Sequence, residues 1–302
     1  MTTRALVVGG TSGIGYGMAC RIAASSPTSS VIISGRTKPD HIPHGNMEFQ
    51  PIEATSMREI KNFTDKLKQQ LSGTSQGQQV HAAETNKLDF LIMTQGIMTI
   101  AGRTETPEGI DRKMALHYYG KQLLIRELLP ALKEDAKVVI VYDSKFGNPD
   151  KVHWEDLDLK TQFSLGTASN HCMVMNDAMI NYFASQQAQG SAKQQGANAK
   201  RHFIHAWPGG VNTSLMREMP WYLGSIAKIL APLATVSPAT CAEYLLNGVE
   251  KVSTPAGDNE ERPRWSYIDN KGRVVESKPI LTEEQIGKIA EHTWELVGVA
   301  LK

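Results

Sequence analysis

The sequence predicts an α/β fold with a doubly wound parallel sheet of about seven strands and helices on both faces. Short apolar, β-branched runs alternate along the chain with segments whose apolar residues repeat at helical spacing. This alternation is typical of stacked βαβ units, whose parallel strands are covered on both faces by helices. The runs expected to be strands are 5–8, 31–34, 47–53, 89–94, 137–142, 202–207 and, before a turn at 269–272, 265–268.

Two of the expected helices have clear sequence signals. In 111–133, leucines at helical spacing form an apolar stripe that ends near Pro130. A closing helix within 280–302 begins after Thr282, which supplies an N-cap followed by an acidic first turn. Between helices and strands, the polar stretches 72–87 and 190–201 are expected to be surface insertions.

The length of the chain favours one domain. A single hydrophobic core still suffices at 302 residues, and 41% of the residues are hydrophobic. Neither an internal repeat nor a linker divides the sequence. We therefore expect residues 1–302 to form a single domain, with 214–235 as the lid over the substrate.

Charge and cysteine content restrict the class of protein. The 32 Lys and Arg residues nearly match the 31 Asp and Glu residues, and a net charge of +1 gives no field to attract nucleic acid or anionic lipid. The three cysteines lack CxxC or Cys/His spacing, so neither a disulfide framework nor a metal site is expected. No apolar run approaches the ~20 residues of a membrane span, and no signal-peptide pattern opens the chain. These features predict a cytoplasmic protein with neither a nucleic-acid nor a membrane partner.

A glycine loop follows the first expected strand. The run 6–15 reads LVVGGTSGIG, in which a buried strand leads into glycines and then into a helix. Glycine permits a tight turn and the close approach of backbone to a pyrophosphate, which then lies at the positive end of the helix. This is the arrangement of a Rossmann fold. It predicts that a dinucleotide is contacted by Gly9, Thr11, Ser12, Gly13, Ile14 and Gly15.

Three motifs together resemble the short-chain dehydrogenase/reductase family, and the resemblance covers nearly the whole chain. The glycine loop is similar to the family's TGxxxGxG turn, with Val8 in the place of the threonine. Residues 94–96 (TQG) stand where the family has NNAG, and 208–213 (PGGVNT) match PGxVxT. Within the family, the chain resembles fungal reductases. The resemblance implies further cofactor contacts from Gln95, Gly96, Pro208, Gly209, Val211 and Thr213.

The end of the second strand favours NADP(H) as the cofactor. An acidic residue at this place binds the ribose hydroxyls of NAD, whereas an arginine accommodates a 2′-phosphate. The chain has Arg36 here, a bidentate donor for phosphate, with Ser34 and Thr37 as hydroxyl donors beside it. At the end of the third strand, Glu53 and Ala54 stand where the family has an acidic residue beside the adenine.

The YxxxK pair that the family uses for catalysis has no counterpart at the matching place. In the family, the tyrosine protonates the developing alkoxide, and the lysine lowers the pKa of the tyrosine. On the aligned helix, Ser169 stands in the tyrosine place and Met173 in the lysine place, and 163–177 contains neither tyrosine nor lysine. A literal YxxxK at 267–271 falls in the expected terminal turn, where this spacing does not put both side chains on one helix face.

The remaining candidates for catalysis surround the expected nicotinamide. His117 stands in the place of the family's asparagine, either as a proton-transfer group or as an ordinary hydrogen-bonded residue. Ser144 keeps the spacing of the family's serine, and a one-residue shift would put Asp143 there instead. Tyr142 is a further candidate, with a solvent-facing strand end as the alternative for it and for Asp143. Also expected to face the pocket are Ser169, His171 and, from the lid, Trp221 and Tyr222.

Three functions are compatible with this pattern. The first is an NADP(H)-dependent oxidoreductase of a biosynthetic pathway that acts on a bulky apolar small molecule with a non-standard proton donor. A cationic C=N substrate would need no proton at its nitrogen. The second is a redox-neutral cyclase, dehydratase or isomerase, and the third is a non-catalytic NADPH-binding regulator. The fold by itself does not choose among them, and a homo-oligomer is compatible with each.

Overall fold

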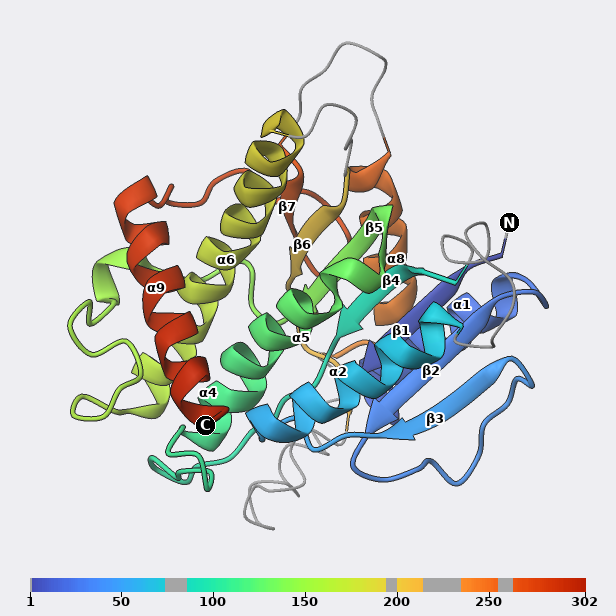
Figure 1. The fold of residues 1–302 in the computed structure, drawn as a ribbon, viewed down its shortest axis with the longest axis horizontal. Helices are drawn as coiled ribbons and strands as arrows, with labels where there is room; N and C mark the ends of the chain where they lie inside the picture. Colours follow the sequence, from blue (N-terminus) through green and yellow to red (C-terminus); the bar gives the residue numbers. More distant parts are fainter. Residues whose placement is uncertain (1, 74–85, 194–199, 214–234, 255–262) are drawn as a thin grey trace.

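The computed structural model describes residues 2–73, 86–193, 200–213, 235–254 and 263–302. Within them, seven parallel strands form one sheet in the order β3-β2-β1-β4-β5-β6-β7 (Figure 1). The predicted parallel sheet is therefore confirmed, although β5 begins well before residue 137. The strands are β1 (Arg4–Val8), β2 (Ser30–Gly35), β3 (Met47–Pro51), β4 (Leu88–Met93), β5 (Leu132–Val141), β6 (His202–Ala206) and β7 (Trp265–Ile268).

Helices cover both faces of the sheet, as predicted (Figure 1). On one face, α1 (Gly13–Ser25) and α8 (Pro238–Ser253) pack against each other over a buried apolar cluster. A second and larger apolar cluster lies beneath the helices of the opposite face. These helices are α2 (Met57–Ser72), α4 (Arg112–Met114), α5 (Gly120–Leu128), α6 (Leu165–Lys193) and α9 (Glu283–Ala300), with 3₁₀ turns at Leu129–Ala131 and Pro149–Lys151.

The winding of the chain reverses between β1 and β4. From β1 the chain continues into α1 on one face, whereas from β4 it leads to α4 and α5 on the other. The two strands are neighbours in the sheet, with Val8 beside Met93 at their carboxyl ends. Loops that diverge from adjacent carboxyl ends leave a crevice, which is where open α/β sheets bind their ligands.

The helix expected over 111–133 is confirmed for 112–128, but it is not a regular α-helix throughout. A π-turn (Ala115–Tyr119) separates α4 from α5, and the chain has already entered β5 at Leu132. A Cβ atom at Gly120 would lie 2.8 Å from the carbonyl oxygen of Ala54, so only a glycine allows α5 to pass this segment so closely. π-turns insert a residue into a helix and occur frequently at functional sites.

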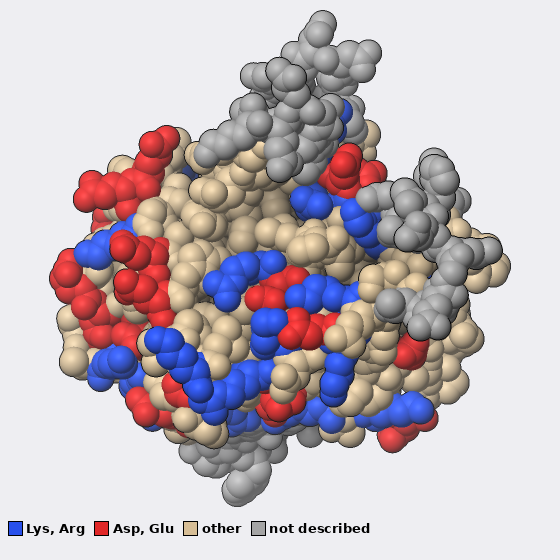
Figure 2. Space-filling view, in the orientation of Figure 1, with Lys and Arg blue, Asp and Glu red and all other residues tan. Residues whose placement is uncertain are grey.

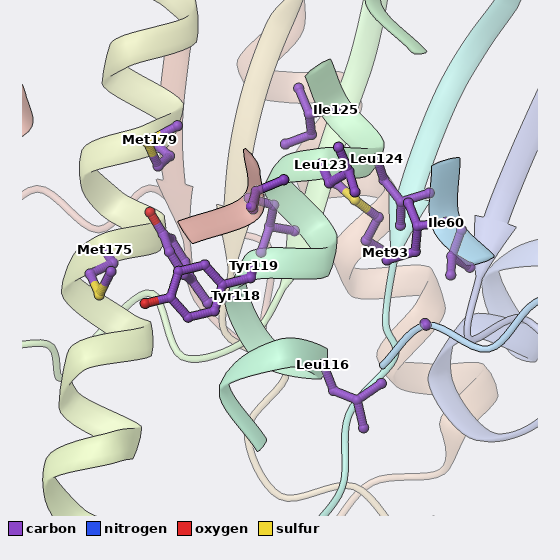
Figure 3. Packing of buried hydrophobic residues seen from close by; sticks show 14 of the residues in the cluster. Ile60, Met93, Leu116, Tyr118, Tyr119, Leu123, Leu124, Ile125, Met175 and Met179 are labelled. Carbon is purple, nitrogen blue, oxygen red and sulfur yellow. The ribbon is translucent and has the colours of Figure 1, made fainter. Parts of the chain in front are cut away.

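Buried side chains hold this helix between α2 and α6 (Figure 3). Leu123 and Leu124 point toward the side of α2, where Ile60 lies. Tyr118 points the opposite way, toward α6 (Figure 3). Its hydroxyl lies 2.6 Å from the Oγ1 atom of Thr293, and this bond links the π-turn to α9.

The C-terminal segment confirms two expectations. After β7, the turn at 269–272 brings Val274 back to a single antiparallel bridge with Ile268. The closing helix is α9, which begins with a reciprocal capping box in which Thr282 and Gln285 bond to each other's backbone N–H groups. Two orphan N–H donors of the helix end are satisfied in this way.

Three predicted segments lie partly outside the described residues. Residues 214–234 of the expected lid, including Trp221 and Tyr222, are not described. Neither are 74–85 of the polar stretch 72–87 nor 194–199 of the polar stretch 190–201. No helix in the described part of the chain is long and apolar enough to cross a membrane. On the face shown in Figure 2, basic and acidic side chains are interspersed, and acidic ones gather along the edge where α9 lies.

Candidate active site

A cavity of about 730 Å³ opens at the crevice between β1 and β4. It brings together most of the predicted cofactor residues and several of the catalytic candidates. The glycine loop and the ends of β2 and β3 contribute Gly9, Thr11, Ser12, Gly13, Ile14, Gly35, Arg36, Thr37, Glu53, Ala54 and Thr55. The segments that follow β4, β5 and β6 contribute Thr94, Gln95, Gly96, Ile97, Met98, Ile100, Tyr142, Asp143, Trp207, Pro208 and Thr213. The helices and the π-turn contribute Lys113, His117, Leu165, Ser169, Cys172 and Met173.

Two glycines of the loop are required by packing. Gly9 has a φ of +80°, and a Cβ atom there would lie 2.5 Å from the backbone nitrogen of Gln95. A Cβ atom on Gly15 would lie 2.4 Å from the Oγ1 atom of Thr94, which donates a hydrogen bond to the Gly9 carbonyl. These glycines let the loop after β1 and the end of β4 touch, so that both border the same cavity. Gly15 itself does not line it.

The first turn of α1 is a suitable place for an anion. Ser12 is the N-cap residue, yet its side chain accepts no hydrogen bond from the helix, and the first turn has no acidic residue. Gly13 has a φ of +58°, and a Cβ there would be 3.1 Å from the Thr213 side chain. The N–H groups of a helix start and its dipole favour phosphate oxygens, so this turn fits a pyrophosphate.

The end of β2 carries the expected cation. Arg36 and Thr37 are exposed and line the cavity, and no ion pair within the described residues engages Arg36. Ser34 departs from the prediction, because its side chain is fully buried and lies outside the cavity. It contributes its carbonyl oxygen instead, which accepts hydrogen bonds from the N–H groups of Gly9 and Gly10. A 2′-phosphate at this place would therefore meet the arginine and one hydroxyl.

Two polar side chains line the cavity near the ends of β3 and β4. Glu53 forms hydrogen bonds with Thr55, whereas Gln95 has no partner within the described residues. The Oε1 atom of Glu53 accepts hydrogen bonds from the Thr55 N–H at 3.1 Å and the Thr55 hydroxyl at 2.7 Å. Gln95 is 8% exposed, and both atoms of its amide are buried with no partner in the described part of the chain. A buried unpaired amide is costly, and a ligand in the cavity would satisfy it.

His117 is held as a neutral imidazole. Its Nε2 atom accepts a hydrogen bond from the Ile97 N–H at 3.0 Å, which places the ring proton on Nδ1. Burial, with the charges of Lys121 and Lys113, lowers the pKa of His117 to about 3. Of the two interpretations of this residue, the contacts favour a hydrogen-bonded structural histidine over a proton-transfer group.

Tyr142 is the candidate with the most direct access to the α6 wall. Its hydroxyl lies 3.2 Å from the Oγ atom of Ser169, and its ring stands 4.8 Å from that of His117. Burial raises the pKa of Tyr142 well above its usual value. The phenol is therefore protonated at physiological pH, and it is a weaker acid than a solvent-exposed tyrosine. Ser169 and Met173 both line the α6 wall.

The assignment of Ser144 to the site is corrected by the structure, because Asp143 lines the cavity and Ser144 does not. Ser144 is fully buried outside the cavity, and its hydroxyl donates to the carbonyl of Ile268 at 2.8 Å. Asp143, the one-residue alternative, lines the cavity, while its Oδ1 atom accepts hydrogen bonds from the N–H groups of Lys145 and Phe146. Asp143, and not Ser144, therefore faces the cavity at this place.

Three further predicted residues lie outside the cavity. His171 is fully buried, and its two ring nitrogens bond to the His153 N–H and the Leu157 carbonyl. Gly209 packs against Asn270, since a Cβ there would lie 2.8 Å from that side chain, and Val211 forms a backbone bridge with Val236. Gly209 and Val211 thus connect the segment after β6 to its neighbours.

The apolar rim of the cavity was not predicted from the sequence. Met98, Ile100 and Leu165 line it while remaining 44%, 52% and 37% exposed. Phe146, 58% exposed, packs edge-to-face on Trp207, another lining residue, with ring centroids 5.2 Å apart. These residues come from four separate loops and helix ends, so no periodic pattern could have grouped them. Within the described residues, no cluster of His, Cys, Asp and Glu could hold a metal ion.

Comparison with known proteins identifies relatives of this chain. A protein from Emericella nidulans named oxidoreductase AN1596 is 33% identical over 223 residues, which are 70% of this chain and 59% of that protein. The short-chain dehydrogenase/reductase SAT2 of Stachybotrys chartarum is 24% identical over 254 residues, 77% of this chain and 67% of that protein. The chain is thus similar in sequence to proteins named oxidoreductase and short-chain dehydrogenase/reductase. It spans about three fifths of the length of the Emericella relative, and no family model matches it.

Solved structures show the same fold. A short-chain dehydrogenase/reductase from Burkholderia multivorans with bound NADP superposes with a TM-score of 0.58 at 14% identity, covering 91% of this chain and 99% of that one. The shared feature is the seven-stranded parallel sheet with helices on both sides. The expected Rossmann-type fold of the family is thereby confirmed.

Proposed function

We propose that this chain is an NADP(H)-dependent oxidoreductase that acts on an apolar small molecule, with Tyr142 as its proton donor. The observation that carries the proposal is the 3.2 Å separation between the Tyr142 hydroxyl and the Oγ atom of Ser169, at the wall of the cavity that the glycine loop borders. A phenol from the end of β5 thus reaches the α6 position where the sequence lacks the family's tyrosine. The two hydroxyls are available to one substrate oxygen.

The residues around the glycine loop fit the cofactor. The open first turn of α1, at Ser12 and Gly13, would hold the pyrophosphate, and Arg36 would bind the 2′-phosphate. Gln95 would use its unpaired amide, and Thr213 and Pro208 close the far side of the cavity. When bound, NADPH supplies a hydride to the substrate. The homologues named oxidoreductase and the neighbour with bound NADP support this assignment.

In the proposed reaction, the protein supplies the proton and positions the oxygen that receives it. The protonated phenol of Tyr142 donates to the oxygen that becomes negative, while the Ser169 hydroxyl positions that oxygen by a second hydrogen bond. His117 supports the phenol by packing against its ring and holds the segment after β4 through the Ile97 N–H. Asp143, also at the cavity, is restrained by its bonds to the following backbone.

The rim indicates the class of substrate. Met98, Ile100, Leu165 and Trp207 give the entrance a predominantly apolar lining. Burial of apolar surface is worth ~25 cal/mol per Å², so a bulky apolar ligand gains affinity there and a small polar one gains little. We therefore assign the substrate as an apolar carbonyl compound, or the alcohol formed from it.

The test follows NADPH oxidation with a panel of apolar aldehydes and ketones and with preformed iminium ions. Turnover of carbonyl substrates that falls at least a hundredfold in Tyr142→Phe, with unchanged NADPH binding by titration calorimetry, supports the proposal. The matched control is Tyr182→Phe, a partly buried tyrosine of α6 that packs on Phe183. Full turnover in Tyr142→Phe, or turnover of iminium ions alone, would overturn the assignment of the proton donor.

A further inference from the structure

A lysine is buried behind the wall of the cavity. Lys121 lies in α5 and is fully buried. Its Nζ atom donates a hydrogen bond to the carbonyl oxygen of Val141 at 2.9 Å, and within the described residues no carboxylate pairs with it. Burying a cationic group without an ionic partner is unfavourable, and an apolar side chain of similar volume is often more stable. The fold alone gives no reason for a lysine at this position.

The surroundings of the amine point to the catalytic wall. Its hydrogen-bond acceptor, Val141, directly precedes Tyr142, and Nζ lies 5.5 Å from the centroid of the Tyr142 ring. One helical turn earlier on the same helix face, His117 packs against the same ring. The lysine thus lies against the phenol from inside the protein, while the phenol hydroxyl extends to Ser169.

We propose that Lys121 is a positioning residue that fixes Tyr142 through the Val141 carbonyl and stabilises the negative charge left on the phenol oxygen after it has donated its proton. The proposal rests on the function proposed above. In this proposal, Lys121 of α5 supplies the positive charge that is missing from α6, where Met173 stands in the place of the family's lysine. A cation close to an aromatic ring also interacts favourably with the ring itself.

The charge of the amine depends on pH in the physiological range. Burial lowers the pKa of Lys121 to about 7. The groups that face it are His117 from the π-turn, Tyr142 from β5, Cys172 from α6 and, farther away, His205 from β6. Burial keeps the thiol and both imidazoles neutral, because it raises the pKa of Cys172 and lowers those of His117 and His205.

Two further charges lie beyond these groups. The Nδ1 atom of His205 lies 2.7 Å from the carboxylate of Asp177 in α6, and Lys278 donates to the same carboxylate. The negative charge of Asp177 is therefore neutralised by the positive charge of Lys278. Among the described groups that face Tyr142, the amine of Lys121 therefore changes its charge near neutral pH. Since the cation stabilises the phenolate, carbonyl reduction is expected to slow as the pH rises through about 7.

The experiment compares Lys121→Met and Lys121→Gln with the wild type. Both variants remove the charge, and glutamine retains a donor for the Val141 carbonyl. We expect unchanged NADPH affinity by calorimetry, a fall in kcat of at least tenfold in both variants, and loss of the pH dependence of kcat near 7. The matched control is Lys137→Met, since Lys137 also lies 5.5 Å from an aromatic centroid, that of Phe90, but away from the cavity. It should leave kcat and its pH profile unchanged.

A readout independent of turnover is the ¹⁵N resonance of the lysine side chains. One resonance should titrate near pH 7 in the wild type and be absent in Lys121→Met. Wild-type kcat in Lys121→Gln would overturn the role of the charge, and a Lys121 resonance that titrates only above pH 9 would overturn the expected pH dependence. If Tyr142→Phe is inactive while both lysine variants are fully active, this inference fails and the proposed function stands. If Tyr142→Phe is fully active, the proposed function fails first.

Discussion

The Nε2 atom of His117 accepts a hydrogen bond from the N–H of Ile97, so the imidazole links the π-turn to the segment that follows β4. This contact gives His117 a structural role. With its pKa lowered to about 3 by burial, the ring is a neutral imidazole near neutral pH and does not act as an imidazolium acid.

For His117, we therefore expect a stability effect and no catalytic ionisation. His117→Ala leaves a backbone N–H without its acceptor, which should lower the free energy of unfolding by about 1–3 kcal/mol. His117→Gln, which offers an acceptor of similar reach, should lose less. Urea denaturation measures both. The pH profile of kcat should show no step near 6.5 that disappears in either variant, and such a step would identify the imidazole as the proton donor instead.

Two glycines of the loop should respond differently to alanine. At Gly9, a Cβ would meet the Gln95 backbone nitrogen at 2.5 Å with φ at +80°, so Gly9→Ala should destabilise the fold by several kcal/mol or prevent it. At Gly13, the nearest atom is a methyl of Thr213 at 3.1 Å, so Gly13→Ala should fold while NADPH affinity falls at least tenfold.

The measurements are thermal unfolding and calorimetric titration with NADPH. Gly102→Ala serves as the control, because nothing lies within 4 Å of a Cβ at this position and φ is ordinary. A folded Gly9→Ala with wild-type melting temperature would contradict the packing described for the two loops. Equal NADPH affinity in Gly13→Ala would show that the pyrophosphate lies elsewhere.

Much of this site could be predicted from sequence, because its determinants are local. The glycine loop lies within ten residues of a buried strand, and Arg36 follows another. The assignment of Ser144 failed because it depended on an alignment exact to one residue beyond the end of β5, where Asp143 lines the cavity and Ser144 is buried. Local patterns give an element reliably, but its last residues are set by contacts such as the Ile268 carbonyl.

Lys121 was missed for a related reason. A lysine in an amphipathic helix is usually on the solvated face, and the uninterrupted helix expected over 111–133 gave no cause to think otherwise. The π-turn adds one residue, which rotates everything after it by about 100° relative to a regular helix. The π-turn lies directly before the close approach of Gly120 to Ala54, a contact between distant segments that no sequence pattern contains.

Arg36 should determine the choice of cofactor. Because the arginine stands at the end of β2 without an ion-pair partner in the described part of the chain, it is available to a 2′-phosphate. Arg36→Ala should weaken NADPH binding by roughly ten- to a hundredfold, since a charge-assisted contact is worth ~1.5–3 kcal/mol, and leave NADH binding unchanged. Titration calorimetry with both cofactors checks this, with Lys38→Ala as a neighbouring control. Equal losses for the two cofactors would place the arginine at a shared part of the dinucleotide.

The burial of Lys121 should appear as a pH-dependent cost in stability. Its pKa falls from 10.5 in the unfolded chain to about 7 in the fold, so between these values the unfolded chain binds more protons and stability rises with pH. At ~1.4 kcal/mol per pKa unit, the cost is of the order of 5 kcal/mol below pH 7 and vanishes above about 10.5. Lys121→Met removes the buried amine and with it this cost. Urea denaturation should therefore show Lys121→Met more stable than the wild type, by a margin that is largest at pH 6.5 and much smaller at pH 9.5. The Lys137→Met control should show no such margin at either pH, and an equal margin at both for Lys121→Met would mean that the buried amine keeps its ordinary pKa.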